Sequence, residues 1–109
     1  MVLTIIAVLV AAAPVDLAAS APRAAFAACL KQAVSQAKSS KVAVDAFDAF
    51  VRGQCAATEA DLRKAVIAID LKNGVSRKDA NENAELELED YFLMTLERYE
   101  AQLRKDSAQ

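Results

Sequence analysis

The sequence predicts an all-α fold, a small bundle of about four helices with a long C-terminal helix, cross-linked by one disulfide. Apolar residues make up 55% of the 109 residues, and only two Gly and two Pro occur. This composition argues against disorder and against a turn-rich β fold. Alanine, the strongest helix former, is abundant, and apolar residues recur at the spacings of three and four that mark one face of a helix.

The first twenty residues have the pattern of a secretory signal peptide. An almost unbroken apolar run covers residues 1–15 and ends at Asp16. At about 1.5 Å per residue, this run is too short to cross a hydrocarbon core of about 30 Å comfortably. A short apolar core followed by small residues is typical of a cleaved leader. We predict a signal peptide over 1–20, cleaved after Ser20, with an uncleaved membrane anchor as the alternative.

Cleavage after Ser20 leaves a single helical domain over 21–109. We expect this domain to have no membrane segment and to be periplasmic or secreted. Pro22 suits the first turn of its first helix, where a backbone N–H is not needed. One apolar face follows on that helix: Phe26, Cys29, Leu30, Ala33 and Ala37. The polar stretch KSSK at 38–41 interrupts it. We expect a second helix that starts near Val44 or Asp45 and runs toward Gly53 and Cys55.

Two further helices are bounded by capping signals. Thr58 opens a Thr-x-x-Asp sequence that resembles a capping box. The helix after it carries one apolar face: Leu62, Ala65, Val66 and Ile69. Gly74 is placed to end that helix in a left-handed conformation. Ser76 opens a Ser-x-x-Asp start, and because neither Pro nor Gly occurs from there to Gln109, we expect a last helix of about thirty residues.

The last helix has two opposed apolar faces. At 100° per residue, its core-facing sector contains Ala80, Ala84, Leu88, Tyr91, Phe92, Thr95, Leu96, Tyr99 and Leu103. Leu86 and Leu93 fall nearly opposite this sector, seven residues apart and among charged residues. Single exposed leucines are ordinary, but a heptad-spaced pair is typical of a seam between helices. We interpret Leu86 and Leu93 as a candidate surface for a protein partner or for self-association.

Cys29 and Cys55 are the two cysteines of the chain, so they allow one pairing within it. A lipid anchor at Cys29 is disfavoured because Asp16 and Arg23 separate it from the apolar core of the leader. A reactive thiol needs a nearby cation, a helix N-terminus or a CxxC partner, whereas Cys29 lies in the middle of a predicted helix. Since an exported chain meets an oxidising compartment, we predict a Cys29–Cys55 disulfide.

The charged residues exclude several functions and leave one alternative open. No His occurs, which excludes Ser–His and Cys–His catalysis and disfavours a zinc site. The net charge of −2 gives no electrostatic case for binding nucleic acid or an anionic membrane. Glu82, Glu85 and Glu89 share one helical face and could bind a hard cation such as Ca²⁺. Acids in the first half of a helix are more often simply a solvated face, which is the reading we prefer.

We therefore expect a non-catalytic, exported helical protein that binds a macromolecular partner. We expect it to need no cofactor and to contain no metal site. The alternative is a cation-binding or acidic regulatory module that uses the helical face from Glu82 to Asp90. Calcium titration followed by thermal melting separates the two, because a specific cation site would raise the melting temperature.

Overall fold

The computed structural model describes residues 14–108 of the chain, with side chains from residue 18 onward. This part contains four α-helices and no strand: α1 (Pro14–Ser39), α2 (Val44–Gln54), α3 (Ala56–Lys72) and α4 (Arg77–Ser107). The predicted all-α bundle is confirmed, including the long last helix, which has 31 residues. Within residues 14–108, none of the helices combines the length and hydropathy that a membrane span requires.

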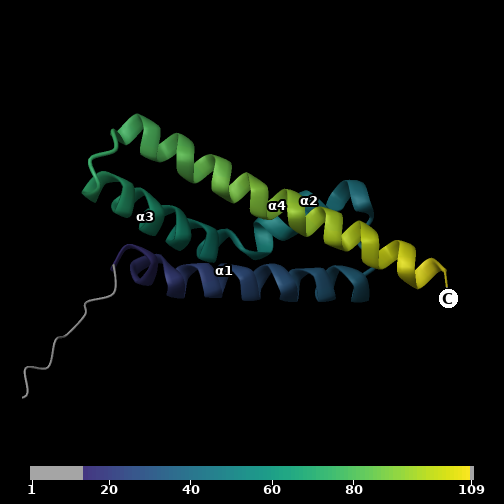
Figure 1. Cartoon of the computed structure of the whole chain (residues 1–109). Helices are drawn as coiled ribbons and strands as arrows, with labels where there is room; N and C mark the ends of the chain where they lie inside the picture. Colours follow the sequence, from purple (N-terminus) through teal and green to yellow (C-terminus); the bar gives the residue numbers. More distant parts are fainter. Residues whose placement is uncertain (1–13, 109) are drawn as a thin grey trace, which may run out of the picture.

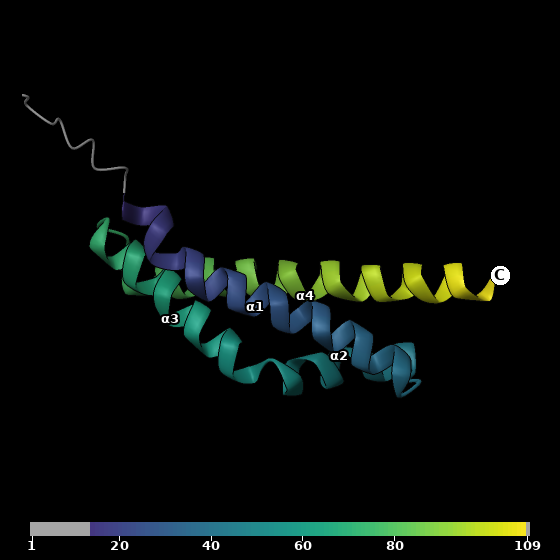
Figure 2. The same cartoon turned by 90° about the horizontal axis from the view of Figure 1, so that it is seen from below.

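The four helices form three arms (Figure 1). α1 makes the first arm, α2 and α3 return one after the other as the second, and α4 runs back alongside as the third. Cys55 is both the C-cap of α2 and the N-cap of α3, so these two helices behave as one bent arm. The C-terminal end of α4 extends beyond the other helices (Figure 2).

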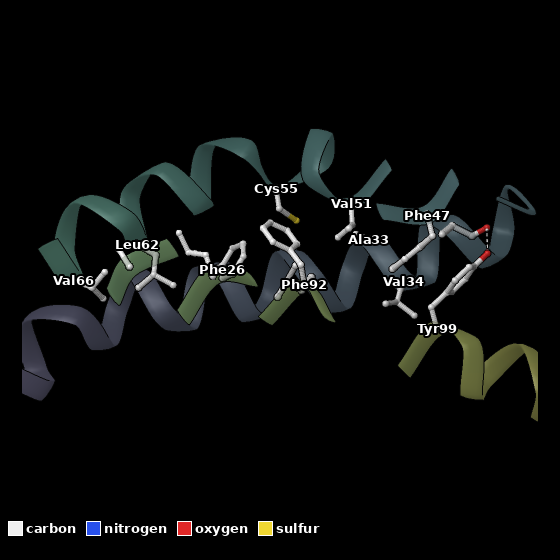
Figure 3. Packing of buried hydrophobic residues seen from close by; sticks show 14 of the residues in the cluster. Phe26, Ala33, Val34, Phe47, Val51, Cys55, Leu62, Val66, Phe92 and Tyr99 are labelled. Atoms are coloured by element: carbon white, nitrogen blue, oxygen red, sulfur yellow. Dashed lines mark hydrogen bonds between the residues drawn. The ribbon is translucent and has the colours of Figure 1, made fainter. Parts of the chain in front are cut away.

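The core is built on two aromatic pairs that join different arms (Figure 3). The ring of Phe26 in α1 packs edge-on against Phe92 in α4, with 5.5 Å between ring centroids. Phe47 in α2 stacks on Tyr99 in α4, with centroids 4.2 Å apart. The Tyr99 hydroxyl donates a hydrogen bond to the carbonyl of Val42, in the turn between α1 and α2. All four rings are fully buried, so each pair removes a large apolar surface from water.

The predicted inner face of α4 is confirmed. Its buried members are Ala80, Ala84, Leu88, Phe92, Thr95 and Tyr99. Its partly buried members pack against the core at the edge of this face: Tyr91, Leu96 and Leu103. Since α4 buries a single continuous stripe, the opposite side of the helix is left to solvent or to a partner.

Both predicted signals at the α3–α4 turn are confirmed. The Ser76 hydroxyl oxygen accepts a hydrogen bond from the backbone N–H of Asp79 at 3.2 Å, as an N-cap residue does. Gly74 has φ +84°, and its N–H donates to the carbonyl of Leu71 at 3.2 Å. The next amide reaches back to the carbonyl of Asp70 at 3.0 Å. These two bonds make a Schellman motif, which ends α3 sharply.

Two predicted helix starts are wrong. α3 begins at Ala56, so Thr58 lies inside its first turn and donates its hydroxyl to the Cys55 carbonyl at 3.1 Å. The reason is that α2 passes almost directly into α3, which leaves no room for a separate capping residue. α1 begins at Pro14, so Pro22 lies inside the helix instead of in its first turn. The alanine-rich residues on both sides of Pro22 favour a helix strongly enough to continue through it.

The predicted signal peptide over 1–20 falls mostly on residues 1–13, which lie outside the described residues. The described helix α1 runs through the predicted cleavage point after Ser20. Cleavage there removes the fully buried Ala19 from the core. It also places Pro22 in the first turn of the shortened helix, where its missing N–H has no cost.

Replacing Lys41, two residues after the end of α1, with glycine is expected to stabilise the fold. The Lys41 φ of +54° is the left-handed conformation, which costs a residue with a side chain roughly 1 kcal/mol relative to glycine. The Lys41→Gly variant should therefore raise the free energy of unfolding by about 0.5–1 kcal/mol, measured by urea denaturation. Lys31→Gly, in the interior of α1, should lower it by a similar amount. Destabilisation by both changes would contradict the left-handed end of α1.

Candidate partner-binding surface

The outer side of α4 exposes large apolar side chains. The exposed fractions of Leu86 and Leu93 are 67% and 55%, and that of Met94 is 59%. We call Leu86 and Leu93 the leucine ridge. They are separated by two helical turns, or about 10.5 Å along the axis, and lie on the same side of the helix. The structure thus places both leucines away from the core.

The surroundings of the leucine ridge are acidic. From Asp79 to Glu97, α4 carries seven Asp or Glu residues and no Lys or Arg. Asp90 lies between the two leucines along the helix, and Glu82 and Glu97 lie one turn before and one turn after them. All three carboxylate residues are exposed. The ridge therefore presents apolar side chains within a region of negative potential.

Three other carboxylates of α4 pair with one arginine from each of the remaining helices. The pairs are Glu87 with Arg23 of α1 at 2.9 Å, Glu89 with Arg52 of α2 at 2.8 Å, and Glu85 with Arg63 of α3 at 2.7 Å. Because these side chains are partly exposed, each pair adds no more than about 1 kcal/mol. Together they flank the buried stripe on both sides. They are consistent with the rotation of α4 that burial of this stripe sets, and this rotation turns the leucine ridge outward.

Arg52 is the most heavily bonded of these arginines. Its Nε donates to Asp48 at 2.9 Å, and its two terminal nitrogens donate to the two carboxylate oxygens of Glu89 at 2.9 and 2.8 Å. The guanidinium carbon lies 4.2 Å from the centroid of the Phe92 ring, which adds a cation–π contact. The hydrogen bonds from Arg52 hold the pKa of Glu89 below its ordinary value.

The lowered pKa of Glu89 predicts a pH-dependent contribution to stability. Because the folded state binds this proton more weakly, the contribution is complete above the unfolded pKa of about 4.3 and is lost as pH falls below it. Glu89→Gln should lower the free energy of unfolding at pH 7 by less than about 1 kcal/mol, since the pair is half-exposed. The difference should shrink at acidic pH, because Glu89 then becomes protonated in the folded protein as well. Urea denaturation across this range measures the difference, and a difference independent of pH would contradict the pairing.

The three glutamates predicted as a cation site have partners in the chain. Glu85 and Glu89 pair with Arg63 and Arg52, and Glu82 lies 4.0 Å from Lys78. Within the described part of the chain, no three acidic or cysteine side chains converge as metal ligands do. A cation at this face would have to displace two guanidinium groups. Cation binding here stays a prediction that calcium titration can test.

The predicted Cys29–Cys55 disulfide is confirmed, with the two Cα atoms 5.8 Å apart. It joins the middle of α1 to the junction of α2 and α3. Figure 3 shows Cys55 near Val51 of α2. Cys55 is fully buried, and Cys29 is half-buried. The bond therefore holds the bent arm against α1 and leaves neither sulfur as a free thiol.

Two surface hollows were not anticipated from the sequence. One, of about 270 Å³, lies between α1, α3 and α4, where Arg23 pairs with Glu87 and the Asn83 amide donates to Asp70 at 3.1 Å. These four polar side chains are already bonded in pairs. The other, of about 650 Å³, is an open groove between α1 and α2 lined by Phe50 and by uncharged polar side chains. Each hollow is lined by residues from different helices, so no short sequence motif could have predicted it.

Comparisons of the chain with protein-family models, with curated proteins and with solved structures find no match. The surface of α4 is therefore the basis on which a function is inferred. Of the features described above, the leucine ridge is the one whose side chains have no evident role within the described bundle.

Proposed function

We propose that this chain is an exported, non-catalytic helical protein that binds a protein partner through the leucine ridge of α4. The observation that carries the proposal is the exposure of Leu86 and Leu93 on a helix whose opposite side carries the buried stripe from Ala80 to Tyr99. Burying one such leucine stabilises by about 1.5–3 kcal/mol. That free energy is gained only when another surface covers the ridge.

The distribution of exposed apolar residues supports a localised surface. Four large apolar residues are strongly exposed in the described chain, and three of them lie within nine positions of α4: Leu86, Leu93 and Met94. Scattered single exposures are normal in soluble proteins, whereas a grouped set with a polar rim is typical of an interaction site.

Export is supported by two features besides the apolar leader. The disulfide between Cys29 and Cys55 is the kind of cross-link that persists in an oxidising compartment. Pro22, unfavourable inside α1, fits the first turn of the helix that remains after cleavage at Ser20. N-terminal sequencing of exported protein tests this directly, with Ala21 expected as the first residue and an intact Met1 as the contrary result.

The ridge is too small to hold a partner by burial alone. Two leucines contribute at most about 3–6 kcal/mol, while association costs about 4–15 kcal/mol in lost freedom of motion. The charged groups around the ridge must therefore contribute to choosing and holding the partner. This requirement connects the acidic surroundings to the proposed function.

The double change Leu86→Glu with Leu93→Glu is expected to abolish partner binding and leave folding intact. Both side chains point away from the core, so helix content and melting temperature should change little, within about 0.5 kcal/mol per site. Binding is measured by cross-linking the tagged protein in cells that export it. The amount of the protein that the unchanged chain cross-links is then compared between the unchanged chain and the variant.

A matched control adds the same charges elsewhere. Ala24→Glu with Ala28→Glu places two glutamates on the exposed side of α1, and this variant should keep its partner. Equal loss of the partner in both variants would show a general effect of charge. Unfolding of the Leu86→Glu, Leu93→Glu variant would show that the leucines belong to the core. Either result contradicts the proposal.

A further inference from the structure

The outer side of α4 contains a regular seam in which leucine alternates with a polar residue. Steps of three and four lead along it through Asn83, Leu86, Asp90, Leu93 and Glu97, and all five residues are exposed. Steps of this kind are those of a coiled coil, in which two positions of each seven-residue repeat face the partner helix. Here the leucines fill one of these positions, and Asn83, Asp90 and Glu97 fill the other.

Asp90 and Glu97 are available to a partner. Neither forms an ion pair with any residue that the structure describes. The three glutamates that pair with arginines, Glu85, Glu87 and Glu89, lie closer to the core. The nearest basic residue further along α4 is Arg98, which lies off the seam by angle. A helix that covers the leucines therefore also covers unpaired carboxylates, and leaving them unpaired would weaken the complex.

We propose that the partner is a basic amphipathic helix in which apolar residues alternate with Lys or Arg at the same steps of three and four. This inference rests on the proposed function and specifies its partner. Apolar side chains would pack on Leu86 and Leu93, and the basic side chains would pair with Asp90 and Glu97. The negative potential of α4 would also attract such a helix and speed its association.

A second copy of this chain does not fit the seam. In a parallel pair of α4 helices, equivalent positions meet, so Asp90 would face Asp90 and Glu97 would face Glu97. In an antiparallel pair, the two alternating positions meet. Leu93 would then face Asp90 and Leu86 would face Glu97, or, one heptad along, Leu86 would face Asp90 and Leu93 would face Asn83. Like charges meet in the first arrangement, and leucine meets a carboxylate in the second. Both arrangements select against self-association.

The test uses two synthetic helical peptides that differ only in the charge of one seam position. One has leucine and lysine alternating at the seam over three heptads, and the other has glutamate in place of lysine. Binding of each fluorescent peptide to the folded, disulfide-bonded protein is measured by anisotropy at low and high salt. We expect the lysine peptide to bind at least about tenfold more tightly, with a difference that shrinks as salt screens the charges.

Charge reversal on the protein is the decisive control. Asp90→Lys with Glu97→Lys should reverse the preference in favour of the glutamate peptide, because both sites are exposed and the fold does not depend on them. Leu86→Glu with Leu93→Glu should bind neither peptide. Equal binding of both peptides to the unchanged protein, no binding of either, or a preference that survives charge reversal would overturn the inference.

Three outcomes separate this inference from the proposed function. If the natural partner is still captured through the leucine ridge but charge reversal at Asp90 and Glu97 leaves its recovery unchanged, the function stands and the basic helix is wrong. If the sedimentation behaviour of the protein shows a dimer that Leu86→Glu with Leu93→Glu dissolves, the ridge binds a second copy and the inference fails. If capture does not depend on the ridge, the proposed function itself fails.

Discussion

Replacing Phe92 with alanine is expected to lower the free energy of unfolding by about 3–5 kcal/mol. Phe92 is 1% exposed and packs edge-on against Phe26 from one side, while the guanidinium of Arg52 covers its ring. Truncation leaves a cavity where α1 and α4 meet and removes the cation–π contact. Because domains of this size have total stabilities of about 5–15 kcal/mol, the loss should be plain in urea denaturation followed by circular dichroism.

The neighbouring residue provides the control for this change. Leu93 is next in sequence and has a similar size, but 55% of it is exposed. Leu93→Ala should alter the free energy of unfolding by no more than about 0.5 kcal/mol. If the two truncations cost equally, the assignment of an inner and an outer face to α4 is wrong.

Removal of the Cys29–Cys55 disulfide is expected to lower the free energy of unfolding by about 3–4 kcal/mol on the chain-entropy model. The bond closes a loop with a sequence separation of 26 and restrains the unfolded chain accordingly. The variant Cys29→Ala with Cys55→Ala removes it without placing a hydroxyl group at the buried position of Cys55. Denaturation with and without dithiothreitol measures the effect.

The reductant separates the cross-link from side-chain packing. Dithiothreitol should destabilise the unchanged protein strongly and have no effect on the alanine variant. If the reductant leaves the unchanged protein as stable as before, the cross-link adds little to the stability of the bundle.

The sequence signals at the α3–α4 turn predicted the structure there because the interactions that form the turn involve only residues close in sequence. Ser76 caps α4 with its own hydroxyl group, and Gly74 ends α3 because it adopts a positive φ without strain. The inner stripe of α4 followed from periodicity, since one continuous core covers the helix along most of its length. Leu86 and Leu93 were placed on the outer side by the same angles.

The local signals at Pro22 and Thr58 gave wrong helix starts because neighbouring segments decide there. Pro22 reads as a helix start only if the residues before it are not helical, and α1 already begins at Pro14. Thr58 reads as a cap only if a loop precedes it, whereas α2 and α3 join at Cys55. A residue-by-residue pattern does not contain this tertiary context.

The ion pairs of α4 were beyond sequence reasoning for a related reason. The alternation of Glu85, Glu87 and Glu89 around Leu88 indicates carboxylates on both sides of a buried stripe. Which arginine reaches each carboxylate depends on how the three arms pack, and the partners are between 22 and 64 positions away in sequence. Sequence reasoning therefore saw the acidic stretch as a solvated or cation-binding face and missed that Glu85, Glu87 and Glu89 contact the other helices.

The most direct test of the partner surface is photo-cross-linking from position 93 of the intact protein in cells that export it. A photoreactive side chain at this position lies on the outer face of α4, and the same side chain at position 28 of α1 serves as the exposed control. We expect one discrete adduct from position 93 that is absent from position 28 and disappears when Leu86→Glu is added. No adduct from position 93, or the same adducts from both positions, would contradict a binding surface on α4.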